Sequence, residues 1–138
     1  MPLTFDEIAV GQKYIATGHI DTAAMDAFQA LSGDSNPLHT DHRAAQQQGF
    51  PNRTVYGFLM LTLLSRIVGM NFQNAVCAAV SSDFTRPAFC GDRVTLEAEI
   101  VQTQMTMRSA VLKFRIDTPA AVVVRGKLTI KFLPGGVS

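Results

Sequence analysis

Residues 57–70 form the stretch that most restricts the fold, because they are apolar on nearly every side of a helix. A helix of this kind has to be surrounded by other parts of the protein. A membrane-spanning helix needs about 20 apolar residues, whereas this stretch is shorter and contains Arg66. We therefore expect a buried helix and no membrane span, with Met60 and Met70 filling gaps in the core.

The second half of the chain supplies strands that could surround this helix. Apolar and polar residues alternate in residues 94–100, 110–117 and 122–132. This period of two is typical of antiparallel strands with one buried face. Residues 12–20 and 75–84 are two further candidate strands. The sequence therefore predicts an α+β fold in which an antiparallel sheet of about five strands curls around one long helix.

The first half of the chain predicts two short helices and no domain boundary. Asp21 can cap a helix that ends at Gly33, and Asp41 can cap a second helix that ends at Gly49. No repeat, low-complexity segment or linker interrupts the chain. We therefore expect a single domain over residues 1–138.

Charge and composition exclude several classes of function. The formal net charge is +1 at pH 7 and no basic stripe is present, so nucleic acid is not an expected partner. The N-terminus lacks a basic segment followed by an apolar run, so no signal peptide is expected. Cys77 and Cys90 are too far apart for a C-x-x-C motif and too few for a disulfide framework. We expect two reduced, half-buried thiols in a cytoplasmic protein.

The predicted loop at residues 31–39 contains one carboxylate and one imidazole, those of Asp34 and His39. Pro37 fixes its own φ and biases Asn36 towards extended backbone, so the loop is stiff. If this loop covers an apolar pocket, Asp34 and His39 could share one water molecule and exchange protons with it. On these residues alone, a turn-capping aspartate and a structural core histidine are the better interpretation.

Metal and free-nucleotide sites have less support. His39 and His42 lie three residues apart, but no cysteine or carboxylate cluster completes a coordination set, so no metal is expected. No phosphate-binding glycine loop is present, so a nucleotide is expected only as part of coenzyme A. Arg86 could contact a coenzyme A phosphate, or it could lie on an edge strand and face solvent.

Residues 28–41 resemble the hydratase motif of the MaoC-like dehydratases, a family that includes the (R)-specific enoyl-CoA hydratases. The similarity runs through Ser-Gly-Asp-Ser-Asn-Pro-Leu-His at residues 32–39. Residues 55–59 resemble the start of the family's central helix, and residues 84–94 resemble its Phe-x-x-Pro-x-x-x-Gly-Asp signature. The resemblance implies a hot-dog fold, in which a curved antiparallel sheet surrounds a long helix, and a homodimer or a higher homo-oligomer.

The resemblance also implies roles for individual residues. Asp34 and His39 match the catalytic pair that activates water, and Asn36 matches the residue that orients their loop. Gly57 matches the backbone N–H that binds the thioester carbonyl, a role that a free N–H at a helix N-terminus also suits physically. A glycine there could equally serve close packing. Ser65 matches a serine near the catalytic pair in some (R)-hydratases.

The implied activity is reversible (R)-specific hydration of trans-2-enoyl-CoA to (R)-3-hydroxyacyl-CoA, with an acyl-CoA thioester as substrate and no separate cofactor. Three alternatives stay open: a 3-hydroxyacyl-acyl-carrier-protein dehydratase, a hot-dog acyl-CoA thioesterase and a non-catalytic acyl-binding module. The thioesterases usually lack the Asp-x-Asn-Pro-x-His loop. Tyr56 stands where many family members have histidine, and it could reshape the mouth of the pocket.

Overall fold

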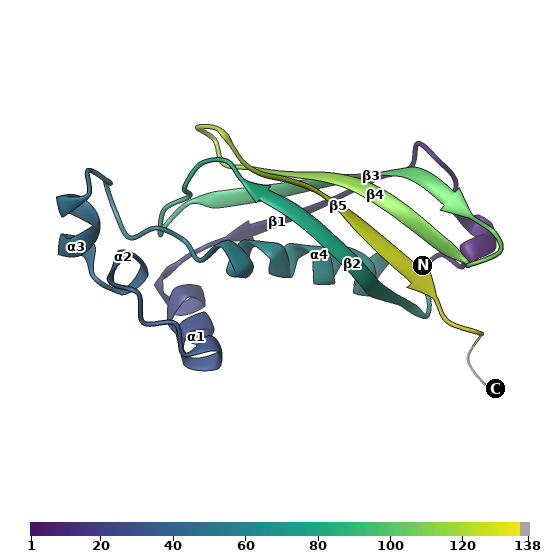
Figure 1. Cartoon of the computed structure of the whole chain (residues 1–138), viewed down its shortest axis with the longest axis horizontal. Helices are drawn as coiled ribbons and strands as arrows, with labels where there is room; N and C mark the ends of the chain where they lie inside the picture. The colour runs from purple at the N-terminus through teal and green to yellow at the C-terminus, as the bar shows by residue number, and fades with distance from the viewer. Residues whose placement is uncertain (136–138) are drawn as a thin grey trace.

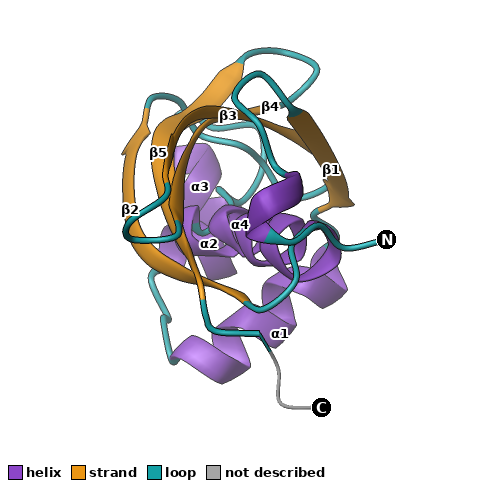
Figure 2. Ribbon diagram, turned by 90° about the vertical axis from the view of Figure 1, so that its right-hand side faces the viewer, coloured by secondary structure: helices purple, strands orange, loops and turns teal. Residues whose placement is uncertain are grey.

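The sheet of this protein bends around one long helix, α4 (Gly57–Asn71), which Figure 2 shows nearly end-on. The computed structural model describes residues 1–135, so residues 136–138 of the expected domain lie outside the described part. All neighbouring strands are antiparallel and follow the order β1-β3-β4-β5-β2. The strands are β1 (Lys13–His19), β2 (Ala75–Phe84), β3 (Arg93–Gln104), β4 (Ser109–Asp117) and β5 (Val122–Phe132). This arrangement confirms the predicted α+β class and the hot-dog fold.

Alternating side chains explain why the sheet closes on the helix. In β4, Leu112, Phe114 and Ile116 are buried, whereas Lys113 and Arg115 between them are exposed. The same alternation runs through β3 and most of β5, so the inner face of the sheet forms one core with the buried side of α4. Burying one such apolar side chain contributes about 1.5–3 kcal/mol, which makes this interface the main apolar contact of the fold.

Helix α4 is buried on one side only, which corrects the expectation of a helix enclosed on most sides. Met60 is buried as predicted, but Met70 is 68% exposed and Phe58 is 73% exposed. The five strands cover only part of the circumference of the helix in a single chain, and its other side faces solvent. No helix within residues 1–135 is long and apolar enough to span a membrane.

The two free cysteines differ in burial because Cys77 lies on an edge strand of the sheet and Cys90 lies in the turn before β3. Cys90 is half-buried as expected, but Cys77 is exposed. Cys77 belongs to β2, the last strand of the sheet, and nearly all residues of β2 are exposed in the single chain. The prediction of two half-buried thiols is therefore wrong for Cys77.

Three short helices gather at one end of the sheet, beside the start of α4 (Figure 1). The predicted helices are α1 (Thr22–Ser32), capped by Asp21 and ended by Gly33 at φ 74°, and α3 (His42–Gln47), capped by Asp41. Between them lies a turn that was predicted as loop, α2 (Pro37–Thr40). At the other end of the sheet is a single 3₁₀ turn, Phe5–Glu7.

Helix α2 forms because the residues before it satisfy its first turn. The Asn36 side chain accepts a hydrogen bond from the Leu38 N–H at 3.0 Å. Pro37, with no N–H to satisfy, occupies the first helical position. Asn36 itself is extended, at φ −54° and ψ 125°, as its place before proline predicts. His39 therefore lies on a helical turn with a defined orientation.

Candidate active site

A cavity of about 450 Å³ opens where α1 and α2 meet the start of α4 and the end of β2. Its walls are mostly apolar, formed by Phe28, Leu38, Phe50, Val55, Phe58, Met60, Phe84 and Pro87. Its polar lining consists of Asp34, His39, Thr54, Tyr56, Gly57 and Arg86. An apolar cavity with a few polar groups converging on it is the usual form of a small-molecule site.

His39 is held by one ring nitrogen and presents the other. Its Nδ1 lies 2.7 Å from the backbone carbonyl oxygen of Thr54. Because a carbonyl only accepts hydrogen bonds, Nδ1 carries the proton in this contact. The Thr54 hydroxyl lies 3.1 Å from the same nitrogen and donates to the Leu38 carbonyl. Nε2 has no hydrogen-bond partner within residues 1–135, so in the neutral ring it is a free acceptor.

Asp34 lies in the exposed loop before α2 and lines the same cavity as His39. Its carboxylate Oδ1 accepts the Asn36 N–H at 3.0 Å, and its own N–H donates to the Ser32 hydroxyl at 3.1 Å. The structure therefore brings Asp34 and His39 to one cavity, as predicted. Asn36 does not line the cavity; its side chain caps α2, which matches a role in orienting the loop.

Gly57 is the first residue of α4 and also lines the cavity. The residue before it, Tyr56, is the N-cap but makes no side-chain capping hydrogen bond. The Gly57 N–H has no backbone acceptor within residues 1–135 and remains free for a ligand. A Cβ at this position would lie 2.7 Å from Cε1 of Phe84. Both interpretations of this glycine are therefore supported, because it allows close packing and leaves an N–H available.

Thr54 is a cavity residue that the sequence did not indicate, and Tyr56, which was expected to reshape the mouth of the pocket, lines the same cavity. Tyr56 is buried, its hydroxyl donates to the Asp34 backbone carbonyl at 3.2 Å, and its ring stacks on His39 with centroids 4.3 Å apart. Burial, and next the nearby Asp34 carboxylate, raise the pKa of the Tyr56 phenol. For Thr54 the one sign in the sequence was its short distance from the matched Gly57, whereas Tyr56 stands directly before that glycine in the family motif.

Two other predicted residues lie in different positions. Ser65 is exposed on α4 and is not among the residues that line the cavity, so the structure does not bring it to Asp34 and His39. Arg86 follows β2 and lines the cavity while remaining exposed. His42 bonds the Asn52 side chain at 2.9 Å. Within residues 1–135 no group of three or more potential metal ligands is present.

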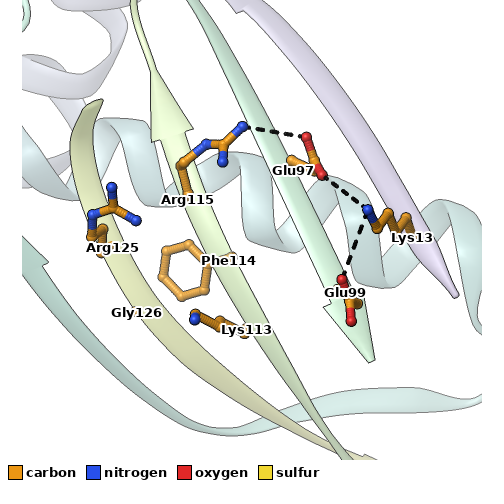
Figure 3. Close-up of a pocket in the computed structure, with 8 residues that line it drawn as sticks. All are labelled: Lys13, Glu97, Glu99, Lys113, Phe114, Arg115, Arg125 and Gly126. Carbon is orange, nitrogen blue, oxygen red and sulfur yellow. Dashed lines mark hydrogen bonds and ion pairs between the residues drawn. The ribbon is translucent and has the colours of Figure 1, made fainter. Parts of the chain in front are cut away.

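A second hollow of about 310 Å³ lies on the sheet and has a different character (Figure 3). Lys13 forms ion pairs with Glu97 and Glu99 at 4.0 and 3.9 Å, and Arg115 approaches Glu97 at 3.5 Å. These side chains are substantially exposed, and exposed ion pairs of this kind contribute little to stability. The hollow contains no imidazole, so the first cavity is the candidate active site.

Residues 6–120 match a known protein family, described as the MaoC like domain. The chain belongs to the MaoC-like dehydratase family. As a MaoC-like dehydratase it is a hydro-lyase, an enzyme that adds water to a substrate or removes it. The match includes residues 28–41, 55–59 and 84–94, on which the resemblance rested.

Individual relatives of this MaoC-like dehydratase agree with the family match. An (R)-specific enoyl-CoA hydratase of Aeromonas caviae is 33% identical over 132 residues, which cover 94% of this chain and 98% of that protein. A mitochondrial 3-hydroxyacyl-[acyl-carrier-protein] dehydratase of Arabidopsis thaliana is 30% identical over 107 residues, 78% of this chain and 64% of that protein. A solved structure of an (R)-hydratase from A. caviae, involved in PHA biosynthesis, superposes with a TM-score of 0.87 at 33% identity, covering 92% of this chain and 98% of the other.

Proposed function

We propose that this MaoC-like dehydratase hydrates trans-2-enoyl-CoA to (R)-3-hydroxyacyl-CoA and catalyses the reverse dehydration. One observation carries the proposal: the free Nε2 of His39 and the carboxylate of Asp34 belong to residues that line one apolar cavity. A neutral imidazole with its Nδ1 proton held by a carbonyl is ready to accept a proton from water. The (R) configuration is inferred from the (R)-specific relatives.

In the proposed mechanism, one water molecule lies between Asp34 and His39. Nε2 of His39 takes a proton from this water as its oxygen forms a bond to C3 of the enoyl group. The pair then returns a proton to C2 on the same face, so that one molecule of water is added in total. Asp34, whose carboxylate only accepts hydrogen bonds when ionised, orients the water and stabilises the imidazolium that forms. In the dehydration direction the same steps run backwards.

Gly57 supplies the second part of the mechanism. As oxygen adds to C3, negative charge develops on the thioester carbonyl oxygen. The free Gly57 N–H at the positive end of α4 stabilises this charge. Removing one such donor typically costs on the order of 10²–10³ in rate. The chain needs no cofactor for these steps, since coenzyme A enters as part of the substrate.

Two thioester carriers, coenzyme A and an acyl-carrier protein, are compatible with the proposed reaction. Arg86 lines the cavity and is exposed, so its guanidinium is accessible to a coenzyme A phosphate, which supports a CoA thioester as substrate. The Arabidopsis relative instead acts, by its name, on acyl-carrier-protein thioesters. A thioesterase or a non-catalytic acyl-binding module fits less well, because a hydro-lyase family and a free imidazole in an apolar cavity both favour hydration.

The direct test is an assay of crotonyl-CoA hydration, in which the loss of ultraviolet absorbance of the enoyl thioester measures the rate. Longer enoyl-CoAs and an enoyl-acyl-carrier-protein are tested in parallel. We expect turnover of the CoA thioesters and (R)-3-hydroxybutyryl-CoA as the crotonyl product. An (S) product would overturn the stereochemical assignment. Turnover of the carrier-protein thioester alone would establish the competing function.

We also propose that the protein is a homodimer joined along β2. This strand ends the sheet, and its exposed apolar residues include Val76, Val80 and Phe84. The exposed apolar side of α4 lies beside it, since the rings of Phe58 and Phe84 are 6.3 Å apart. An apolar edge strand of this length is a template for pairing with another chain, and a second copy would cover both surfaces.

A further inference from the structure

Tyr56 touches both residues of the proposed catalytic pair. Its hydroxyl donates to the backbone carbonyl of Asp34 at 3.2 Å, across 22 positions of the chain. Its ring stacks on the His39 imidazole, with centroids 4.3 Å apart and planes 29° apart. Phe28 also packs against Tyr56, with ring centroids 4.8 Å apart and planes 41° apart. With 3% of its surface exposed, the Tyr56 side chain has little freedom to move.

The Asp34 loop has little else to hold it. Residues 32–36 are all exposed, and their hydrogen bonds are otherwise to near neighbours in the sequence. Within residues 1–135, the Tyr56 hydroxyl is the only hydrogen-bond donor or acceptor outside residues 29–40 that bonds residues 33–36. Losing it would leave the carboxylate on a loop that is anchored only at its two ends.

His39 depends on the same stretch of chain. Its Nδ1 is held by the Thr54 carbonyl, two residues before Tyr56, and its ring lies against the Tyr56 ring. Tyr56 in turn is followed directly by Gly57, the proposed carbonyl-binding N–H. Residues 54–57 therefore hold the His39 imidazole, tether the Asp34 loop and supply the proposed carbonyl-binding N–H, all within one short segment.

We propose that Tyr56 is a positioning residue, which sets the separation of Asp34 and His39 by tethering one with its hydroxyl and supporting the other with its ring. The inference rests on the proposed hydratase function. A phenol suits the task because it is a neutral donor throughout the neutral pH range, and phenylalanine would keep the stacking while losing the tether. Misplacing a reacting group by about 1 Å can cost on the order of 10²-fold in rate.

The test is a double-mutant cycle of Tyr56→Phe and Asp34→Asn, measured as kcat and KM for crotonyl-CoA hydration. Tyr56→Phe alone is expected to lower kcat roughly tenfold and to change KM by less, because the tether acts on the reacting groups. In the Asp34→Asn background the same change is expected to cost less than about twofold, since the group that the hydroxyl positions has gone. A purely structural effect of Tyr56→Phe would lower kcat by the same factor in both backgrounds.

Tyr14→Phe is the matched control. Tyr14 is the other tyrosine of the chain, its hydroxyl also makes one hydrogen bond, to Gln12 at 2.9 Å, and it packs on Phe72 away from the cavity. We expect this variant to keep wild-type kcat. Unchanged kcat in Tyr56→Phe, or equal losses in the two backgrounds, would overturn the inference. Near-normal turnover in Asp34→Asn would instead overturn the proposed function, so the two failures are distinguishable.

Discussion

At the scale of single residues, the site depends on backbone groups that hold side chains in place. The Thr54 carbonyl binds Nδ1 of His39, which lines the cavity, and Nε2 has no hydrogen-bond partner within residues 1–135. The Leu38 N–H holds the Asn36 side chain, and that contact builds the turn on which His39 lies. Backbone groups cannot be removed by substitution, so their effect has to be tested through the side chains that they bind.

Asn36 offers such a test. Asn36→Ala removes the cap of α2, which costs about 1 kcal/mol of local stability. The looser turn is expected to let His39 leave its contact with Thr54 and to lower kcat for enoyl-CoA hydration roughly tenfold. Asn36→Ser keeps a capping oxygen and is expected to retain most of the activity. Equal losses of kcat in Asn36→Ala and Asn36→Ser would show that the capping oxygen does not determine activity.

Both tyrosines predict how stability changes at alkaline pH. Burial raises the pKa of the Tyr14 phenol, and burial together with Asp34 raises that of Tyr56 above the ordinary value of 10.0. The folded state therefore favours the neutral phenols, and this stability is complete below the ordinary pKa and is lost as pH rises through the folded pKa. Urea unfolding between about pH 8 and pH 11 should show a steeper loss in the wild type than in Tyr14→Phe/Tyr56→Phe. Parallel pH curves for the two proteins would contradict this.

The motif residues were predictable, and their supporting residues were not. Asp34, His39 and Asn36 lie within one short segment, so their proximity could be read from the sequence. Thr54 and Tyr56 reach them across 15 and 22 positions, and no local pattern encodes contacts of that length. Its place directly before the matched Gly57 marked Tyr56 but did not reveal the tether.

At the scale of helices and strands, alternation was sufficient for three strands of the sheet but did not predict how α4 is covered. Period-two patterns located β3, β4 and β5, because each has one face on the core. The apolar run of α4 predicted burial on most sides, whereas Phe58 and Met70 are exposed in the single chain. A sequence pattern reports that a surface avoids water and does not say whether the same chain or a second one covers it.

The contact between α4 and β2 predicts the effect of substituting Gly57. In Gly57→Ala the new Cβ would lie 2.7 Å from Cε1 of Phe84, so the ring or the helix has to move. We expect a loss of about 1–3 kcal/mol in unfolding free energy and a lower kcat, because the N–H moves with the helix. Phe84→Leu should relieve the clash. The loss of unfolding free energy in the double variant is therefore expected to be smaller than the sum of the losses in the two single variants. Simple additivity, measured by urea unfolding, would argue against this contact.

At the scale of the whole molecule, the exposed apolar surface of β2 and α4 predicts a dimer. Val80→Lys places a charge on the edge strand β2, where a lysine disfavours strand pairing. We expect wild-type protein to elute as a dimer in size-exclusion chromatography with light scattering, and Val80→Lys as a monomer. Val101→Lys is the control, because Val101 is 39% exposed, close to the 46% of Val80, but lies in the inner strand β3. A wild-type protein that elutes as a monomer would contradict the proposed dimer interface.

The central claim is that Asp34 and His39 together activate water for addition to an enoyl thioester. The most direct measurement is the rate of crotonyl-CoA hydration by wild type and by Asp34→Asn, with Asp6→Asn, an exposed aspartate in the 3₁₀ turn, as the matched control. We predict that Asp34→Asn lowers kcat by about 10²–10⁴-fold while its circular dichroism spectrum and thermal midpoint stay close to those of the wild type, and that Asp6→Asn keeps full activity. A folded Asp34→Asn variant with near-normal turnover would contradict the claim.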